Sequence, residues 1–323
     1  MPTALITGVS GQDGSYLADR LLVEGWVVHA LVRSTRRTDE QDVSTRVTSH
    51  RGDLADPESL HRVIEESEPD FIFNLGGISS VAQSWDQPEL TSTVTGHSVA
   101  VMLDSAWKLQ ERTGREVRFI QASSSEIFGA ATAFPQDETT PIRPVSPYGA
   151  AKAYAHHLTG VYRSKDLFAA TAILYNHESP RRPKAFVTRK ITSGVAAIAA
   201  GRTNVLSLGN LDAIRDWGWA PDYVDAMLKI VSAPNPDDFV VATGIAHRVD
   251  EFVTAAFSSV GIEDWSSYVK IDEQFARPAD APEMIGDPTK ISTLLGWTPQ
   301  TDFPTLVRRM VEHDLTLVTA ANP

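Results

Sequence analysis

Short apolar runs rich in β-branched residues alternate with longer amphipathic stretches through the first half of the chain. This alternation is typical of a strand, a crossover helix and a second, parallel strand. It predicts strands at residues 4–7, 27–32, 47–50, 71–75, 118–122 and 169–174. It predicts helices at residues 15–24, 57–66, 91–110 and 147–165. We therefore expect an α/β fold with a doubly wound parallel sheet, the Rossmann arrangement.

The pattern changes after about residue 175, where basic and proline-rich stretches, a helical pattern near residues 186–200, isolated strands and short helices follow. This half predicts a smaller C-terminal α/β lobe. We divide the chain into a Rossmann domain at residues 1–175, to which segments of the second half could return, and a substrate lobe at residues 176–323. Because ligands of open α/β folds bind beyond the carboxyl ends of the strands, a lobe placed there would close over them.

Composition and charge narrow the classes of partner. The 323 residues carry a formal net charge of −12, which argues against nucleic acid and anionic membranes, since both require surplus Lys and Arg. The chain has no cysteine, which excludes disulfide and thiolate chemistry and fits a reducing cytoplasm. No apolar run approaches the roughly 20 residues that span a bilayer, and residues 1–25 are unlike a signal peptide. We therefore expect a cytoplasmic protein. Because no set of His residues has the spacing of metal ligands, we also expect no metal.

A glycine-rich turn joins the first predicted strand to the first predicted helix. It reads TGVSGQDG at residues 7–14 and places Gly8, Gly11 and Gly14 at spacings of three. Glycine permits the tight turn, the close approach of the backbone to a pyrophosphate and the tight packing of helix on strand. The helix N-terminus then faces the diphosphate with free N–H groups. A glycine-rich turn alone is weak support, but between a strand and a helix it predicts a dinucleotide site.

The end of the second predicted strand bears on which dinucleotide would bind. Arg33 stands about twenty residues after the turn, where NAD-binding folds place an Asp or Glu on the ribose hydroxyls. A guanidinium there suits the 2′-phosphate of NADP, although Arg33, Arg36 and Arg37 could also be solvated loop residues. The missing carboxylate favours NADP. Asp53 and Leu54 follow the third predicted strand and are expected to flank the adenine, with an ordinary turn carboxylate as the alternative for Asp53.

Tyr148 and Lys152 are four residues apart on a predicted helix, which stacks their side chains on one face. A tyrosine is a poor base at its free pKa of about 10, and a neighbouring cation stabilises the phenolate. Lys152 can supply that cation. Such a pair occurs by chance on many helices, but after a nucleotide loop and five predicted strands it indicates a proton-transfer site.

Three serines and a glutamate at residues 123–126 follow the fifth predicted strand, at the edge of the sheet where a nicotinamide is expected. Hydroxyls there can hydrogen-bond a sugar hydroxyl or its ketone, and Glu126 can act as a general acid or base. The alternative for Glu126 is a helix-capping or surface carboxylate.

A basic cluster follows at residues 181–190 of this otherwise acidic chain. Guanidinium groups pair bidentately with phosphate oxygens, so the cluster is a candidate phosphate clamp. A solvated basic loop is the alternative. Its members are Arg181, Arg182, Lys184, Arg189 and Lys190.

Seven segments, taken together, resemble the GDP-mannose 4,6-dehydratases, a family of extended short-chain dehydrogenases/reductases. The resemblance covers nearly the whole chain in the same order. The segments are TGVSGQDGSYLA at 7–18, SSSEIFG at 123–129, SPYGAAKAYA at 146–155, YNHESPRR at 175–182, FVTRKIT at 186–192, LGNLDAIRDWGWAPDYV at 208–224 and GDPTKISTLLGW at 286–297.

The resemblance implies a reaction in which the cofactor NADP is regenerated. Tyr148, with Lys152, would take the proton of the hydroxyl at carbon 4 while the hydride of that carbon passes to NADP⁺. Glu126 would then remove the proton at carbon 5, which the ketone has made acidic, and help to expel the hydroxyl at carbon 6 as water. Return of the hydride to carbon 6 would give GDP-4-keto-6-deoxymannose. Ser124 stands where this family commonly has Thr and keeps the hydroxyl.

The resemblance also implies binding residues and assembly. Cofactor contacts are expected from Gly8, Gly11, Gln12, Asp13, Gly14, Arg33, Asp53, Leu54, Leu75, Gly76, Ser79, Tyr148, Lys152, His177 and Arg182. Contacts with the GDP-sugar are expected from Ser79, Ser125, Asn176, Lys190, Arg215, Arg277 and Glu283. The family forms homo-oligomers, so a homodimer or homotetramer is expected. The segment after Arg33 is shorter than in many members, where it helps to join subunits.

Three alternatives remain at the level of sequence. A reductase or epimerase of 4-keto sugars shares the loop and the Tyr-Lys pair but has less need of Glu126. A dehydratase of a GDP-heptose differs only beyond carbon 5 of its substrate. A non-catalytic NADP sensor belongs to a different class and would keep the fold without turnover.

Overall fold

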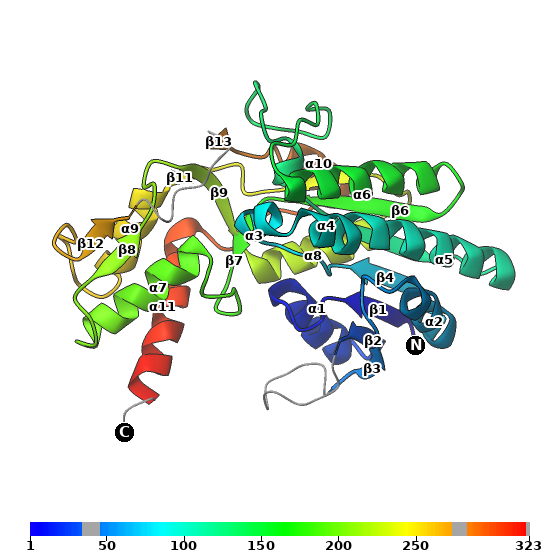
Figure 1. Ribbon diagram of the computed structural model, residues 1–323, viewed down its shortest axis with the longest axis horizontal. Coiled ribbons are helices and arrows are strands. Elements are labelled where there is room, and N and C mark those ends of the chain that lie inside the picture. The colour runs from blue at the N-terminus through cyan, green and yellow to red at the C-terminus, as the bar shows by residue number, and fades with distance from the viewer. Residues whose placement is uncertain (34–45, 273–282, 321–323) are drawn as a thin grey trace.

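The computed structural model describes residues 1–33, 46–272 and 283–320. A seven-stranded sheet forms the centre of the larger lobe, in the order β10-β6-β5-β4-β1-β2-β3 with every neighbouring pair parallel (Figure 1). Its strands are β1 (Thr3–Thr7), β2 (Val27–Val32), β3 (Thr48–Arg51), β4 (Phe71–Asn74), β5 (Arg118–Ser124), β6 (Phe168–Leu174) and β10 (Asp238–Val241). The strand order reverses beside β1, so the ligand crevice of this fold lies beyond the carboxyl ends of β1 and β4. The predicted doubly wound parallel sheet is confirmed.

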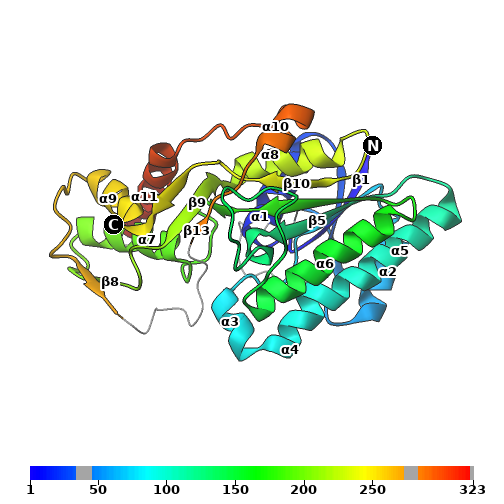
Figure 2. The ribbon, with the colours of Figure 1, turned by 90° about the horizontal axis from the view of Figure 1, so that it is seen from above.

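Helices cover both faces of this sheet (Figure 2). On one face, apolar side chains of α2 (Pro57–Ser67), α5 (Ser98–Thr113) and α6 (Pro147–Arg163) pack in one core with residues of β4 and β5. On the other face, α1 (Gln12–Val23) and α8 (Ala220–Val231) pack in a second core. Burial on both faces explains why β6 consists of seven buried residues without alternation.

Three segments of the second half return to the first sheet. β10 pairs with β6, α8 lies beside α1, and α10 (Thr289–Leu295) packs against β10. β10 contributes only the apolar run Phe239-Val-Val to the pattern, too short to be distinguished from a strand of the smaller lobe. The domain division itself stays a prediction, with these segments as the returning part.

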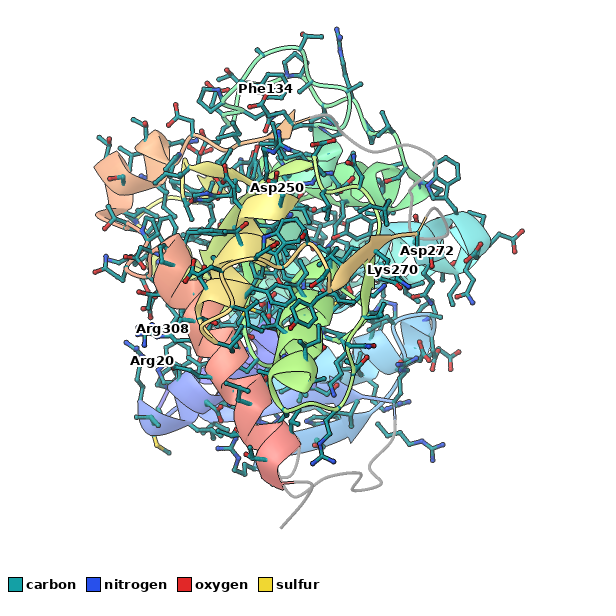
Figure 3. The ribbon with its side chains drawn as sticks, turned by 90° about the vertical axis from the view of Figure 1, so that its left-hand side faces the viewer. Arg20, Phe134, Asp250, Lys270, Asp272 and Arg308 are labelled. Atoms are coloured by element: carbon teal, nitrogen blue, oxygen red, sulfur yellow. The ribbon has the colours of Figure 1, made fainter. Side chains whose placement is uncertain are left out.

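The smaller lobe contains a four-stranded sheet of β7 (Asn176–Glu178), β9 (Ile214–Trp219), β11 (Ala246–Arg248) and β13 (Glu283–Met284). β8 (Leu206–Leu208) pairs separately with β12 (Val269–Ile271). α7 (Val187–Ala199), α9 (Val249–Ser258) and α11 (Phe303–Ala320) enclose the third core. Figure 3 shows α11, which carries Arg308, running beside α7 and α9. In the described ranges, no helix combines the length and the apolarity needed to cross a lipid bilayer.

Three elements differ from the prediction. The helix expected at residues 91–110 consists of α4 (Pro88–Thr91), a π-helical segment (Ser92–His97) and α5. A π-turn inserts a residue into the helical repeat, so a regular period cannot predict it. The strand expected to end at residue 122 continues to Ser124, which places two of the three serines inside β5 instead of after it. Helix α3 (Val81–Asp86), capped by Ser80, was not predicted.

Candidate active site

The glycine-rich turn packs as tightly as its sequence predicts. Gly8 has a φ of 74°, and a Cβ added to it would lie 2.9 Å from the backbone nitrogen of Gly76 at the end of β4. The Gly11 N–H donates to the carbonyl oxygen of Gly8 at 2.9 Å. A Cβ on Gly14 would overlap that same carbonyl group, and one on Gly76 would lie 2.8 Å from Leu54 Cδ1. Alanine at these positions would push the turn away from the sheet edge where a diphosphate is expected.

The two polar residues of the turn contact the smaller lobe. Gln12 Nε2 donates to the His177 carbonyl oxygen at 2.9 Å, and Ser179 Oγ donates to Gln12 Oε1 at 2.8 Å. Asp13 Oδ2 lies 2.9 Å from His177 Nε2. The structure thus brings three predicted cofactor residues, Gln12 and Asp13 of the Rossmann domain and His177 of the smaller lobe, into one network.

Tyr148 lies in the first turn of α6, where Ser146 caps the helix by accepting from Gly149 N at 3.0 Å. Burial is the main cause that raises the pKa of Tyr148 to about 12; a hydrogen bond with the Ser124 side chain opposes it, and the Glu126 carboxylate adds to it. The phenol is therefore protonated at neutral pH, and it becomes a base only when positive charge is placed beside it.

Lys152 supplies part of that charge from one turn further along α6. Its ammonium lies 5.9 Å from the centre of the Tyr148 ring and donates to the carbonyl oxygen of Ala122 at 2.7 Å. Burial lowers the pKa of Lys152 to about 8, and the negative charge of Asp13 opposes this effect. The predicted pairing of Tyr148 and Lys152 on one helical face agrees with this arrangement.

Glu126 is held close to the same phenol by the end of β5. Ser124 ends the strand, and its hydroxyl accepts from the Glu126 N–H at 3.3 Å as a 3₁₀ turn (Ser125–Ile127) begins. A Cβ on Gly149 would lie 2.6 Å from the Glu126 carbonyl oxygen, so the turn rests directly on the start of α6. Glu126 is half-buried, and its charge is one of the causes that raise the pKa of Tyr148. A phenol, an ammonium and a carboxylate therefore converge beyond the end of β5.

The residues predicted to bind the adenosine part of the cofactor follow β2 and β3, at the opposite edge of the sheet from β10. Arg33 follows β2 and lines a cavity of about 630 Å³ with Asp53 and the α2 residue Arg62. Asp53 Oδ1 accepts from the Ala55 N–H at 2.9 Å, which is the turn role named as its alternative. Arg36 and Arg37 lie outside the described residues.

The basic cluster does not act as one clamp, which corrects that prediction. Arg189 is buried and forms an ion pair with Asp314 of α11, while Arg181 pairs with Asp19 of α1 at 2.8 Å. These guanidinium groups hold elements together and are occupied by carboxylates. Arg182 differs from these two arginines in that its charge influences the pKa values of three predicted site residues, Asp13, His177 and Tyr148.

Predicted sugar-binding residues lie on adjacent strands of the smaller sheet. Asn176 of β7 pairs in register with Trp217 of β9, and Glu283 of β13 pairs with Ile214, next to Arg215. Of the others, Ser125 is buried in the 3₁₀ turn, Ser79 is exposed after β4, Leu75 is half-buried beside Gly76, Lys190 lies on α7, and Arg277 lies outside the described residues.

Comparison with known proteins agrees with this geometry. Residues 5–310 match the family described as GDP-mannose 4,6 dehydratase. The chain is 44% identical over 326 residues to GDP-mannose 4,6 dehydratase 2 of Arabidopsis thaliana, covering 97% of this chain and 87% of the relative. The chain belongs to the GDP-mannose 4,6-dehydratase family. The human GDP-mannose 4,6 dehydratase is 41% identical, with 98% of this chain and 92% of the relative covered.

Solved structures support the fold of this dehydratase family member. A UDP-glucose 4-epimerase from Thermotoga maritima, determined with UDP-glucose, has a TM-score of 0.85 at 22% identity and covers 98% of this chain and 99% of its own. A dTDP-glucose 4,6-dehydratase from Bacillus anthracis, determined with NAD, has a TM-score of 0.80 at 18% identity and covers 97% and 96%.

Sequence reasoning missed residues that hold the predicted ones in place. Glu178 lies 3.4 Å from Arg182 and accepts from Thr188 Oγ1 at 2.6 Å, and Ser179 holds Gln12. Both residues follow His177 in the YNHESPRR segment, and the family resemblance of that segment is the signal that could have identified them. Asp216, which accepts from the N–H groups of Thr243 and Gly244 at 2.9 Å, had only its position beside Arg215 to mark it.

Proposed function

We propose that this protein removes one molecule of water from GDP-mannose, using bound NADP, and forms GDP-4-keto-6-deoxymannose. The observation that carries the proposal is the convergence of Tyr148, Lys152 and Glu126 beyond the end of β5 in a member of this family. A ketone-forming pair and a separate carboxylate are what oxidation followed by elimination requires.

The residues present fit a nicotinamide dinucleotide. The turn at Gly8, Gly11 and Gly14 leaves the N-terminus of α1 facing the crevice, where backbone N–H groups can donate hydrogen bonds to a diphosphate. Arg33 stands at the end of β2 where a carboxylate would favour NAD, and it supports NADP. When bound, NADP⁺ accepts the hydride of carbon 4 of the sugar and gives it back at carbon 6.

Side chains of the protein transfer the protons of the proposed reaction. Tyr148 Oη takes the proton of the hydroxyl at carbon 4, with Lys152 stabilising the phenolate and Ser124 Oγ hydrogen-bonded to the phenol. Once carbon 4 is a ketone, a carboxylate oxygen of Glu126 takes the proton at carbon 5 and passes it to the departing hydroxyl of carbon 6, which leaves as water. When the hydride reaches carbon 6, carbon 5 must regain a proton, and the phenol of Tyr148 gives up the one that it took from the hydroxyl at carbon 4, which returns the side chains to their starting state.

The smaller lobe would bind the nucleotide sugar. Asn176, Arg215 and Glu283 lie on neighbouring strands, and Lys190 follows on α7, so these polar groups come from one side of the crevice. His177 and Arg182 would meet the cofactor from the same lobe. Arg277 remains a family-based expectation outside the described residues.

Glu126 favours a dehydratase over a 4-keto-sugar reductase, and the substrate in the names of the relatives favours GDP-mannose over a GDP-heptose. The complete set of proton-transfer groups argues against a sensor without turnover. A homodimer or homotetramer in the cytoplasm completes the proposal, and light scattering of the purified protein measures the assembly directly.

Incubation with GDP-mannose and a trace of NADP⁺ tests the proposal. The expected product is a ketone that has lost one water by mass spectrometry, with no net change in NADPH absorbance. Net consumption of NADPH with a 4-keto sugar, and no turnover of GDP-mannose, would support the reductase instead. Tight NADP binding without turnover of any GDP-sugar would support the sensor.

A further inference from the structure

The imidazole of His177 faces a hydrogen-bond acceptor at each of its two nitrogens. Nδ1 lies 2.7 Å from the carbonyl oxygen of Tyr175, and Nε2 lies 2.9 Å from Oδ2 of Asp13. A carbonyl oxygen can only accept, so Nδ1 carries a proton. The second contact also needs one proton, either on Nε2 or on the Asp13 carboxyl group.

The surroundings of Asp13 decide where that proton resides. Gln12 Nε2 donates to the other oxygen, Oδ1, at 3.1 Å, and the positive charge of Arg182 acts on both partners. Both effects stabilise a carboxylate. Although burial raises the pKa of Asp13, its contacts with His177 and Gln12 outweigh it and lower the pKa below 3.8. Burial likewise lowers the pKa of His177, but Asp13 raises it above 6.5 overall. The geometry and the charges agree on an imidazolium paired with a carboxylate.

The role of the His177–Asp13 pair follows from its position beside the glycine-rich turn. Asp13 lies in the first turn of α1, directly after the glycine-rich turn, and its charge influences the pKa values of both Tyr148 and Lys152. A bare carboxylate there would repel a diphosphate and oppose formation of the phenolate. His177 comes from β7 of the smaller lobe, and its ring stacks on Tyr223 of α8 with centroids 4.7 Å apart.

We propose that His177 is a positioning residue that stays an imidazolium, neutralises Asp13 beside the diphosphate site and fastens the glycine-rich turn to the smaller lobe. The inference rests on the proposed function in one respect, that a dinucleotide binds at this turn. The charged or titratable groups around the pair are Arg182, Tyr148, Lys152 and Tyr223, with Glu178 holding Arg182.

Affinity for NADP tests the charge balance in a double-mutant cycle. H177Q keeps a donor toward Asp13 but removes the positive charge, so we expect the Kd for NADP to rise roughly ten- to hundredfold at neutral pH. D13N/H177Q restores neutrality and is expected to recover most of that loss. H247Q is the matched control, because it removes an imidazole paired with Glu251 at 2.9 Å on the surface, and its Kd should equal that of the parent.

The pH dependence follows from the sign of the shift. His177 is protonated, and its ion pair with Asp13 contributes fully, below the unfolded-state histidine pKa of about 6.5. The ion pair is lost as the pH rises through the higher pKa of folded His177. The Kd of the parent protein should therefore approach that of H177Q at alkaline pH. Because Lys152, with a pKa of about 8, also loses its charge as the pH rises, D13N/H177Q, which keeps Lys152, is the reference curve. Equal Kd values for parent and H177Q, with both proteins folded, would overturn the proposal.

Nitrogen-15 NMR of histidine-labelled protein without cofactor tests the protonation state independently of binding. We expect both ring nitrogens of His177, assigned through H177Q, to carry protons at neutral pH. A neutral ring at that pH would overturn the inference even if NADP binds. An imidazolium in a protein that binds neither NADP nor NAD would instead contradict the proposed function and leave the pair itself confirmed.

Discussion

At the scale of residues, burial determines the protonation states of Tyr148 and Lys152, the two residues that we propose transfer the first proton. Tyr148, with a pKa of about 12, is a phenol at neutral pH, and Lys152, with a pKa of about 8, is still mostly an ammonium. In the proposed reaction, the charge that makes Tyr148 a base would come from Lys152 together with the cationic nicotinamide ring of the bound cofactor. The same burial means that a charged Lys152 destabilises the folded state.

Replacing Lys152 by Met is expected to stabilise the protein while abolishing activity. The fall of its pKa from 10.5 to about 8 corresponds to about 3 kcal/mol of destabilisation at neutral pH, so K152M should unfold with a free energy about 1–3 kcal/mol higher. The Ala122 carbonyl keeps Gln121 Nε2 as a donor at 2.8 Å. The gain should vanish as the pH rises from about 8 towards 10.5, where the lysine is neutral in both states. Urea denaturation at neutral and alkaline pH measures it, and a less stable K152M at neutral pH would contradict this reasoning.

Replacing Glu126 by Gln separates oxidation from elimination. E126Q should still form NADPH in a single turnover with GDP-mannose, while release of the dehydrated product falls about 10²- to 10⁴-fold. E138Q is the matched control, because Glu138 is partly buried like Glu126, burial raises the pKa of Glu138, and glutamine keeps the acceptor for the Val240 N–H. Loss of the NADPH signal in E126Q, or an equal loss of product in E138Q, would remove Glu126 from its role.

Sequence predicted some residue contacts and could not predict others. Tyr148 and Lys152 belong to one helix, whose period alone places them together. Asp13 and His177 are 164 residues apart, and Arg189 meets Asp314 across 125, so only the tertiary fold determines these partners. The failure of the basic cluster as a clamp has this cause, because residue type cannot reveal which carboxylate already neutralises an arginine.

At the scale of elements, the contact between α6 and the 3₁₀ turn after β5 aligns the catalytic groups. G149A should destabilise the protein by about 1–3 kcal/mol and lower kcat, because its Cβ would lie 2.6 Å from the Glu126 carbonyl oxygen and force the two elements apart. Gly160, on the same helix, has nothing within 4 Å of an added Cβ, so G160A should gain about 0.5–1 kcal/mol. Thermal unfolding and kcat of the two variants test this, and similar behaviour of both would contradict it.

Element prediction succeeded where the hydrophobic period was long and regular. The strands and helices of the first half were located to within a few residues, apart from the π-helical interruption before α5 and the unpredicted α3. The second half was harder, because β10 and β13 have four and two residues and carry too little pattern.

At the scale of the whole molecule, the first 175 residues are not complete without the second half. β6 would lose its partner β10, and the core beneath α1 would lose α8 with its eight buried residues. A fragment of residues 1–175 is therefore expected to aggregate or remain unfolded, because an apolar strand edge is exposed. Circular dichroism and gel filtration of the fragment check this, and a monomeric, cooperatively folded fragment would contradict it.

The two lobes together support one central claim, that a single site oxidises, dehydrates and reduces the same sugar. GDP-mannose carrying deuterium at carbon 4 tests it most directly. The dehydrated product is expected to retain this deuterium at carbon 6, because the hydride never leaves the bound cofactor. Product without the label at carbon 6, or label accumulating in free NADPH, would contradict it.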